Sequence, residues 1–560
     1  MKQLIECVPN FSEGRDLAIL KQITDEIEKV EGVKLLDVDP GFATNRTVVT
    51  FVGEPAAAVE AAFRAIKKAS EIIDMSKHSG EHPRMGATDV CPLIPIANIS
   101  MAECAEWAHK LAKRVGEETE VPVYMYEAAA TRPERQNLAS VRAGEYEALP
   151  KKMTMPEWQP DYGKAVFNSR AGATVIGARD FLVAYNVNLN TSSVRRANSV
   201  AFDVREQGRI LREGDPVNGP VVNDANGEPV RIPGTCKSVK GIGWFIEEYG
   251  IAQVSMNLTN INISPLHVVF DECCKSADVH GLRVTGSELV GLVPKKVMTD
   301  AGKFFLEKQR RSAGVSEVEL IDIAVKTLGL NEISTFDPQK KIIEYQLDDT
   351  GATPLLNMNL KEFANETASE SPAPGGGSIS AYVGALGISL ATMVANLSSH
   401  KKGWDHRWAE FSEIAIKGQQ LKDELLRMVD EDTHAFNAIM TAFGLPKSTD
   451  DEKKARTAQI QAATKKAIEV PLRVMELCYS TFDIIEEMVE KGNPNSVTDA
   501  GVGALCARAA IHGANLNVKI NVSGLKDTVF VEKATARANE IIAETDTREK
   551  LILQMVNDKI

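Results

Sequence analysis

The sequence predicts an α+β region made of two βαββαβ-like units, followed by a region built from helices alone. Up to about residue 330, short β-branched and aromatic runs alternate with amphipathic stretches of helical period. Beyond about residue 360, strand patterns nearly disappear and long helical stretches continue. The first pattern is typical of layered sheets and helices, and the second is typical of a helical bundle.

The elements of the first unit follow one another in regular order. Strands are predicted over 4–8, 33–38, 46–52, 90–96 and 121–126, and helices over 16–30, 56–73 and 101–118. In the first helix, apolar residues recur every three or four positions at Leu17, Leu20, Ile23 and Ile27. They share one face of the helix, which would pack on the sheet.

The strand–helix pattern restarts near Phe181. A strand over 181–189 runs into a helix over 192–207, and a strand over 251–258 precedes a helix over 265–278. Asn10-Phe11-Ser12 and Asn188-Leu189-Asn190 stand at the end of the first strand of each half. The two halves are therefore consistent with an ancient duplication.

An interdomain connection is predicted between 331 and 359, where periodicity is lost and Asp337-Pro338 and Asp348-Asp349-Thr350-Gly351 occur. The helices expected after it cover 378–397, 407–444, 455–490, 499–514 and 529–560. The predicted domains are 1–180, 181–329, a linker at 330–357, and a helical domain at 358–560.

Composition excludes some functions. The net charge of −13 argues against a nucleic-acid binder, which needs a basic face. Eight cysteines without a C-x-x-C pair indicate a reducing compartment, and the N-terminal residues lack an apolar signal core, so a cytoplasmic location is expected. The segment 371–399 has no charged residue, but its glycines and serines favour a buried bundle helix over a membrane span.

The segment 77–90 concentrates titratable side chains beside an apolar run. It contains His78, Glu81, His82, Arg84 and Asp89, punctuated by glycine and proline. Titratable groups on a stiff loop are what general acid–base chemistry needs near neutral pH. We interpret this loop as part of an active site.

A zinc peptidase is an alternative interpretation, because His78-x-x-Glu81-His82 matches the H-x-x-E-H pattern. That pattern needs both histidines on one helix face. Pro83 pushes the residue before it out of the helical region, and Gly80 weakens a helix further. The sequence therefore predicts no metal site here. A histidine without a catalytic role is the other alternative.

Charged residues elsewhere in the first half are candidates for supporting roles. Asp39 either orients His82 as an acid partner or shapes a turn at Pro40-Gly41. Arg84, Arg46 and the pair Lys295-Lys296 are candidates to hold substrate carboxylates.

Gly241-Ile242-Gly243-Trp244 lacks the third glycine and the acidic residue of a dinucleotide fingerprint. We therefore do not expect a dinucleotide site there.

The helical domain carries two further candidates. Gly375, Gly376 and Gly377 lead into a helix, and free N–H groups at such a start form an anion site. Asp430 and Asp432 lie in the predicted helix 407–444 among apolar residues, and burial would raise a carboxyl pKa into a range useful for proton abstraction. Asp432 shares the side of Phe436, which favours it over Asp430.

Motifs along nearly the whole chain resemble the bifunctional glutamate formimidoyltransferase–formimidoyltetrahydrofolate cyclodeaminase family. In the first part these are residues 4–14, Leu36-Asp-Val-Asp39, Thr44-Asn-Arg46, Gly80-Glu-His-Pro-Arg-Met-Gly86, Gly172-Ala-Thr-Val175, Arg205-Glu-Gln-Gly208, Gly241-Ile-Gly-Trp244 and 286–294. In the second part they are Ala373-Pro-Gly-Gly-Gly-Ser378 and Asp430-x-Asp432-x-x-Ala435-Phe436. They occur in the order of the family.

The resemblance implies a fold and a function. The first part would comprise two ferredoxin-like subdomains that transfer a formimidoyl group from N-formimidoyl-L-glutamate to tetrahydrofolate. The helical part would close the ring to 5,10-methenyltetrahydrofolate and release ammonia. The family belongs to histidine degradation and uses no metal in these steps. Its members form ring-like homo-octamers that handle polyglutamylated folate.

The resemblance also implies roles for residues. His82 would be the acid–base group of the transferase and Asp432 that of the cyclodeaminase, with Asp430 second. The folate-binding stretch would comprise Gly163, Lys164, Ala165, Val166, Phe167, Asn168, Ser169, Arg170, Ala171 and Gly172. The residues 168–171 depart from the family pattern.

Two other functions stay open beside the peptidase. One is a folate-binding or scaffold protein without turnover, and the other is a transferase that has lost the second activity.

Overall fold

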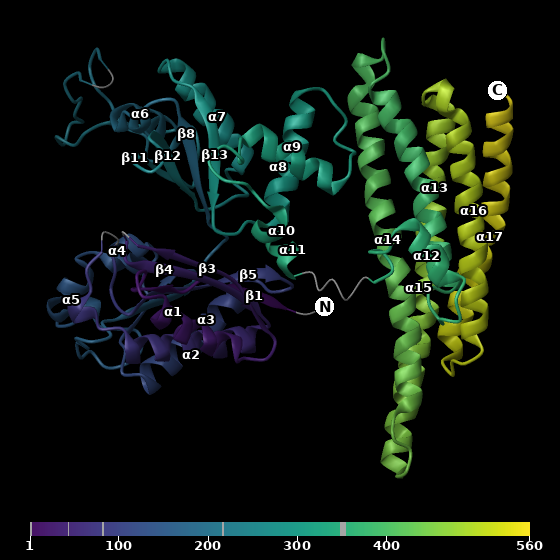
Figure 1. Cartoon of the computed structure of the whole chain (residues 1–560), viewed down its shortest axis with the longest axis horizontal. Coiled ribbons are helices and arrows are strands. Elements are labelled where there is room, and N and C mark those ends of the chain that lie inside the picture. Colours follow the sequence, from purple (N-terminus) through teal and green to yellow (C-terminus); the bar gives the residue numbers. More distant parts are fainter. Residues whose placement is uncertain (1–2, 43, 81–82, 216–217, 348–353) are drawn as a thin grey trace. The chain divides into compact units, whose positions relative to one another are not determined.

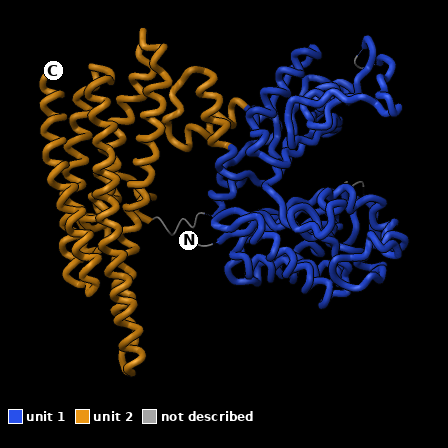
Figure 2. The backbone as a smooth tube through the Cα atoms, turned by 180° about the vertical axis from the view of Figure 1, so that it is seen from behind, with its two compact units in different colours: residues 1–297, 328–347 blue, residues 298–327, 348–560 orange. Residues whose placement is uncertain are grey.

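The structure of the chain is a computed structural model that describes residues 3–42, 44–80, 83–215, 218–347 and 354–560. The chain forms two compact units. The first comprises residues 1–297 and 328–347, and the second comprises residues 298–327 and 348–560 (Figure 2). An N-terminal sheet-containing region is thus followed by a largely helical one, as the sequence predicts.

The first sheet has seven strands, with β1 and β2 at its centre; Figure 1 labels β1, β3, β4 and β5 of this sheet. β1 and β2 both pair antiparallel with β4 and β5, so together they behave as one interrupted strand. β3 extends the sheet beyond β4, and β7 and β6 continue parallel to β5 on the other side. The strands are β1 (Leu4–Cys7), β2 (Asn10–Phe11), β3 (Val33–Gly41), β4 (Arg46–Gly53), β5 (Thr88–Ala97), β6 (Val123–Glu127) and β7 (Thr174–Ala178).

Three helices cover one face of this sheet, namely α1 (Leu17–Glu28), α2 (Pro55–Ile72) and α3 (Met101–Glu118). Their buried side chains, among them Ile23, Phe63 and Leu111, form one core with Cys7 and Phe51 of the strands. The periodicity of the first helix therefore predicts the buried positions Leu20, Ile23 and Ile27 correctly, whereas Leu17, predicted on the same face, is 65% exposed at the start of the helix. The short helices α4 (Leu138–Arg142) and α5 (Glu145–Lys152) contribute to a smaller core on the other face of the sheet.

The second sheet has four antiparallel strands in the order β11-β12-β8-β13. The chain passes through it as strand, helix, two strands, helix, strand, which is also the order of β1, α1, β3, β4, α2 and β5 in the first sheet. Its elements are β8 (Val183–Leu189), α6 (Val194–Val204), β11 (Val239–Ile246), β12 (Ile251–Leu258), α7 (Leu266–Val279) and β13 (Val284–Val290). The two halves thus share one topology, although a two-stranded ribbon, β9 (Arg209–Ile210) with β10 (Arg231–Ile232), interrupts the second.

The segment between the second sheet and the bundle is more ordered than predicted. It contains α8 (Lys295–Lys308), α9 (Glu317–Leu328), α10 (Pro338–Lys341) and α11 (Ile343–Leu347). Residues 298–327 belong to the helical unit, and α10 and α11 belong to the first unit. The predicted connection is therefore not a structureless loop in its described part.

The helical unit is dominated by five long helices. The bundle helices are α12 (Leu360–Thr367), α13 (Gly376–Ser399), α14 (Trp408–Gly444), α15 (Asp450–Lys491), α16 (Val497–Val522) and α17 (Thr528–Asn557). Among the described helices, α13 alone is long and apolar enough to cross a membrane, and 61% of its most apolar window is buried inside this unit. Such burial is typical of a core helix.

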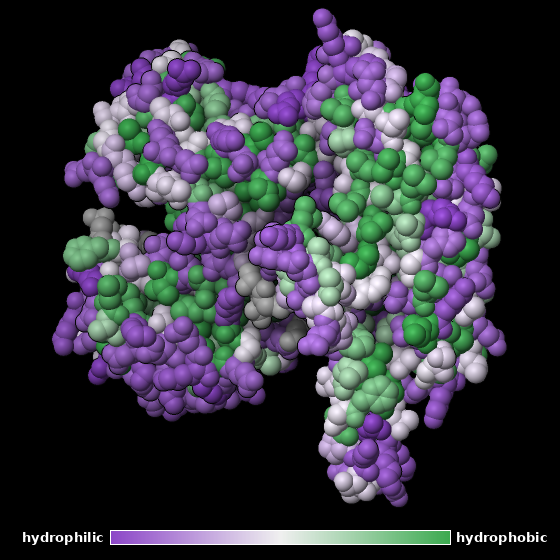
Figure 3. Space-filling view, turned by 45° about the vertical axis from the view of Figure 1, so that its right-hand side comes forward, coloured by the Kyte–Doolittle hydropathy of each residue, from purple (hydrophilic) through white to green (hydrophobic). Residues whose placement is uncertain are grey.

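Apolar side chains also gather on the surface of the helical unit, as the space-filling view shows (Figure 3). Exposed ones on α13 and α16 are Leu386, Met393, Leu397, Val502, Leu505, Leu516 and Ile520. Monomeric proteins rarely leave large apolar patches open to water.

Candidate active sites

Both ring nitrogens of His78 are engaged in the described structure. Its Nε2 lies 2.9 Å from the carbonyl oxygen of Asn45, and Arg84 Nε donates to its Nδ1 at 3.3 Å. Since the carbonyl can only accept, Nε2 is the donor in this contact. This arrangement speaks against His78 as a metal ligand. Glu81 and His82, the other members of the H-x-x-E-H pattern, lie outside the described residues.

Asn45 ties the start of the predicted active-site loop to neighbouring segments. Its side-chain amide donates to the carbonyl oxygen of Ser79 at 3.0 Å and accepts from the N–H of Gly14 at 3.0 Å. Its φ of +47° is one that asparagine tolerates. A Cβ on Gly80 would lie 2.3 Å from the carbonyl oxygen of Thr44, so only glycine allows this approach.

The end of the same loop lies against the stretch predicted to bind folate. Gly86 and Gly172 form an isolated β-bridge, and the N–H of Ala87 donates to the carbonyl oxygen of Ala171 at 2.8 Å. A Cβ on Gly86 would lie 2.4 Å from that same oxygen. The structure therefore brings two separately predicted segments together.

The predicted folate stretch is exposed over 163–166 and then anchored. The Asn168 side chain accepts from the backbone N–H groups of Arg170 and Ala171 at 3.1 and 3.0 Å. Arg170 reaches back to the carbonyl oxygen of Glu71 at 2.8 Å. The residues that depart from the family pattern are thus engaged in local hydrogen bonds, whereas 163–166 are open to solvent.

Asp89 is fully buried and holds the far end of the loop, a role that sequence analysis did not assign. It accepts from the N–H of Met85 at 3.0 Å and from two nitrogens of Arg142. A buried carboxylate needs such a partner because burying an unpaired charge is costly. The partner comes from α4, about fifty residues away, so no local pattern reveals it.

The predicted carboxylate-binding cations differ in their availability. Arg84 forms ion pairs with Glu145 at 2.9 Å and Glu147 at 2.8 Å, so it is already engaged. Arg46 donates to the Asn10 side chain, and its Nε is buried without a protein partner within the described part of the chain. Burial lowers the pKa of Arg46 to about 10. Lys295 begins α8, where its backbone N–H donates to Glu344 at 2.7 Å.

The predicted turn at Pro40-Gly41 is wrong. β3 continues through both residues and ends at Gly41, because Asp39, Pro40 and Gly41 pair with β4. The side chain of Asp39 is exposed on this strand. Burial raises the pKa of the nearby Asp37, Lys341 opposes the shift, and the charge of Asp39 adds to it.

In the helical unit, Asp432 sits against the start of α13. Its Oδ2 accepts from the backbone N–H of Ser378 at 3.0 Å and from the Ser378 hydroxyl at 3.3 Å. A Cβ on Gly377 would lie 2.1 Å from the carboxylate, so glycine is required there. Burial raises the pKa of Asp432, and the bonds from Ser378 oppose the shift only in part.

This geometry changes the interpretation of the glycine-rich segment. One of the N–H groups expected to receive a ligand anion, that of Ser378, instead binds the carboxylate of the chain itself. Gly375 is the N-cap of α13 and has no side-chain cap. Gly376 has no described atom closer than 3.4 Å to the position of a Cβ. The helix start therefore positions Asp432, and Gly375 and Gly376 remain candidates for contact with a ligand.

Asp430 has a different environment from Asp432. It is 2% exposed and accepts from the N–H groups of Leu355 at 3.0 Å and Leu356 at 3.3 Å. Both oxygens are therefore used to hold the segment that precedes α12. This is a structural role, which the sequence could not separate from the environment of Asp432.

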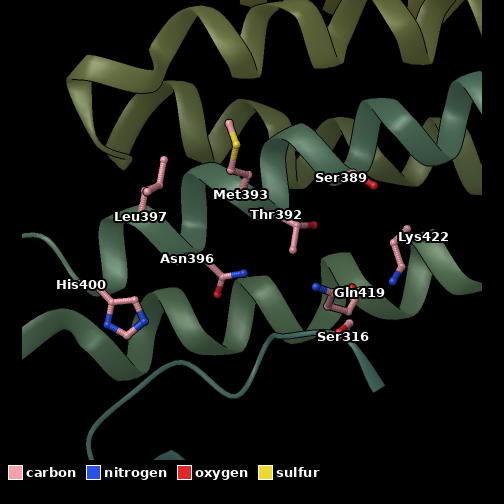
Figure 4. Close-up of a pocket in the computed structure, with 9 residues that line it drawn as sticks. All are labelled: Ser316, Ser389, Thr392, Met393, Asn396, Leu397, His400, Gln419 and Lys422. Carbon is pink, nitrogen blue, oxygen red and sulfur yellow. The ribbon is translucent and has the colours of Figure 1, made fainter. Parts of the chain in front are cut away.

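A cavity of about 420 Å³ lies elsewhere in the helical unit (Figure 4). Asn396 of α13 and Gln419 of α14 line it, and both side-chain amides donate to the carbonyl oxygen of Gly314, at 2.8 and 3.1 Å. Asn396 lies 18 residues after Ser378 on α13, or roughly 27 Å along the helix. The cavity is therefore not part of the Asp432 site.

No group of three or more His, Cys, Asp or Glu able to hold a metal ion is found among the described residues, which omit 81 and 82.

The sheet-containing unit carries the loop that includes His78, and the helical unit carries the half-buried carboxylate of Asp432, so each unit holds one candidate active site, as expected of a bifunctional enzyme. Family models match the chain almost throughout: "Formiminotransferase domain, N-terminal subdomain" over 4–179, "Formiminotransferase domain" over 184–348, and "Formiminotransferase-cyclodeaminase" over 359–540. The chain belongs to the formimidoyltransferase-cyclodeaminase family.

Curated relatives agree with this assignment. The formimidoyltransferase-cyclodeaminase of Rattus norvegicus is 41% identical over 99% of this chain and 98% of its own length. The glutamate formimidoyltransferase of Streptococcus pyogenes serotype M1 is 41% identical over 55% of this chain and 94% of its own. The methenyltetrahydrofolate cyclohydrolase of Methylorubrum extorquens is 39% identical over 36% of this chain and 98% of its own.

Proposed function

We infer that this chain is a bifunctional folate enzyme of histidine degradation. It transfers the formimidoyl group of N-formimidoyl-L-glutamate to tetrahydrofolate, and it then cyclises 5-formimidoyltetrahydrofolate to 5,10-methenyltetrahydrofolate with release of ammonia. Support comes from relatives that cover the whole chain and from others, named for a single activity, that cover its parts. Tetrahydrofolate is the co-substrate.

The environment of Asp432 is the main structural support for the second activity, the cyclisation. The second folate nitrogen attacks the formimidoyl carbon and loses its proton, and the formimidoyl nitrogen leaves as ammonia after gaining one. A carboxyl group with a raised pKa accepts the first proton and returns it more readily near neutral pH. We assign this role to Asp432, with Gly375, Gly376 and Gly377 at the ligand side of the helix start.

For the transferase we propose His82 as the acid–base group, oriented by Asp39. The glutamate amine must be protonated to leave after the folate nitrogen attacks the amidine carbon. Support comes from the family resemblance of the loop and from its neighbours, since Asn45 and Asp89 hold its two described ends. We propose that tetrahydrofolate lies along 163–172, with 163–166 open for contact.

The test is absorbance of the methenyl product after mixing the two substrates with the full chain. The wild type should form it, His82→Ala should not, and Asp432→Asn should stop at formimidoyl-folate. Asp430→Asn is the matched control, because this residue should affect stability and not the chemistry. Product formation by Asp432→Asn at the wild-type rate would contradict the assignment.

Further expectations rest on the family. We propose two ferredoxin-like subdomains within 1–180 and 181–329, a homo-octamer, polyglutamylated folate as the natural co-substrate, a cytoplasmic location, and no metal requirement. The strand order β11-β12-β8-β13 and its counterpart in the first sheet support the subdomain assignment. The exposed apolar residues of α13 and α16 support assembly.

A further inference from the structure

The Gly241-Ile242-Gly243-Trp244 motif has no role in the chemistry proposed above. It lies in β11, an edge strand of the second sheet. Gly243 faces α6, where a Cβ would lie 2.3 Å from the backbone nitrogen of Asn198. The Asn198 side chain binds the N–H of Gly243 at 2.9 Å and its carbonyl oxygen at 3.3 Å. This glycine therefore allows close helix packing, which does not explain Trp244 on the opposite face.

Trp244 begins a row of hydrogen-bonded side chains that crosses the sheet. It is paired in register with Gln253, which is paired with Asn188. The indole N–H donates to Gln253 at 3.0 Å, Gln253 donates to Asn188 at 2.8 Å, and Asn188 donates to Glu332 at 2.6 Å. Glu332 fills the place next in the row, where Gly286 has no side chain: a Cβ on Gly286 would lie 2.3 Å from its carboxylate.

The row fixes the orientation of an exposed ring. Gln253 is 1% exposed and Asn188 is fully buried, whereas Trp244 is 39% exposed. All three bonds point toward one carboxylate, so each polarises the next, and losing one would leave a buried amide unsatisfied. An aromatic ring that is open to solvent yet held in one orientation is pre-organised for binding, because little entropy is lost when a ligand stacks on it.

The same face of β11 carries Ile242 and Lys240. Ile242 is 53% exposed and extends the apolar surface beside the indole. Lys240 lies close enough to Glu127, at the end of β6, for its positive charge to lower the pKa of that carboxyl, which burial raises. This face of the second sheet is therefore directed toward the first sheet, within the same compact unit.

We propose that Trp244 is a stacking platform for a planar ring of tetrahydrofolate in the transferase unit, an inference that rests on the proposed function. The flat pteridine and the aminobenzoyl ring of the co-substrate both offer a face to an indole. Gln253, Asn188 and Glu332 are positioning residues that hold the platform.

The experiment compares KM values of the full-length variants. Trp244→Leu keeps an apolar side chain on the strand but removes the ring, and it should raise KM for tetrahydrofolate about tenfold. KM for N-formimidoyl-glutamate and cyclisation of added 5-formimidoyltetrahydrofolate should not change. Trp244→Phe retains a ring and should stay within about threefold of wild type. Gln253→Leu, which releases the ring, should raise the same KM to an intermediate value.

Phe245→Leu is the matched control, since Phe245 is 38% exposed on the same strand but faces the other side of the sheet. An unchanged KM for tetrahydrofolate in Trp244→Leu, or an equal rise in Phe245→Leu, would overturn the platform. If the wild type transfers no formimidoyl group, the proposed function fails instead. In that case, equilibrium dialysis of tetrahydrofolate with wild type and with Trp244→Leu tests the stacking platform without catalysis. Equal affinities of the two chains for tetrahydrofolate would overturn the platform.

Discussion

Replacing Glu6 by glutamine should change how the stability of the chain depends on pH. Glu6 lies in β1 at the centre of the first sheet, is 1% exposed, and has a buried Oε2 without a hydrogen-bond partner in the described structure. Burial raises its pKa to about 7, with Arg179 opposing the shift and Glu344 adding to it. Ionisation of Glu6 in the folded chain therefore costs free energy.

The sign and size of the effect follow from linkage. Between the ordinary pKa of 4.5 and the folded value of about 7, the folded chain keeps a proton that the unfolded chain has lost. Stability contributed by this group is therefore present at low pH and is lost as pH rises through the folded pKa. At 1.36 kcal/mol per pKa unit, the full loss is about 3 kcal/mol, of which about 2.5 kcal/mol falls between pH 5 and pH 8.

Urea unfolding of wild type and Glu6→Gln at several pH values measures this contribution. The contributions of all other titrating groups are the same in both chains, so they cancel when the two unfolding free energies are subtracted. From pH 5 to pH 8 this difference should change by about 2.5 kcal/mol in favour of the variant. Glu31→Gln, at a side chain exposed to water, is the matched control. A flat difference for Glu6→Gln, or one that moves the other way, would refute the reasoning.

Two further substitutions test the geometry of the two sites. Gly377→Ala should lower cyclisation about a hundredfold and leave transfer intact, because the new Cβ would displace the Asp432 carboxylate by about 1 Å. Gly444→Ala, where no described atom lies within 4 Å of the position of a Cβ, should keep cyclisation within a few-fold, and equal losses in both variants would contradict this explanation. Arg142→Leu should destabilise the first unit by about 3–5 kcal/mol in urea unfolding, because it leaves Asp89 buried without its charged partner. A change below about 1 kcal/mol would show that the pair does not hold the loop.

Periodicity predicts the elements whose burial is one-sided. The helix containing Leu20, Ile23 and Ile27 is found where expected. The strand at 46–53 is found as well, although it is buried on both faces, because its β-branched residues mark it. The strands over 174–178 and 239–246 were missed. The first has only five residues, all buried, and the second has glycines where apolar residues would mark its inner face, so neither gives an alternating pattern.

The candidate site shows the same division between local and non-local information. The sequence places Asp430 and Asp432 in one helix, but their roles depend on what packs against each. The segment at 355–356 binds the first, and the start of α13 binds the second. Likewise, the polar row behind Trp244 depends on strand register and on the missing side chain of Gly286, which no local motif records.

Helices α8 and α9 lie within the segment matched by the formiminotransferase family model, yet most of their residues belong to the helical unit. The carbonyl oxygen of Gly314 accepts from Asn396 and Gln419, and a Cβ on Gly314 would lie 2.3 Å from the Cβ of Ala415. Dividing the chain at the linker 330–357 would therefore separate α8 and α9 from the helical unit to which most of their residues belong. The two catalytic parts are thus joined by the packing of α8 and α9 in the helical unit as well as by the continuous chain.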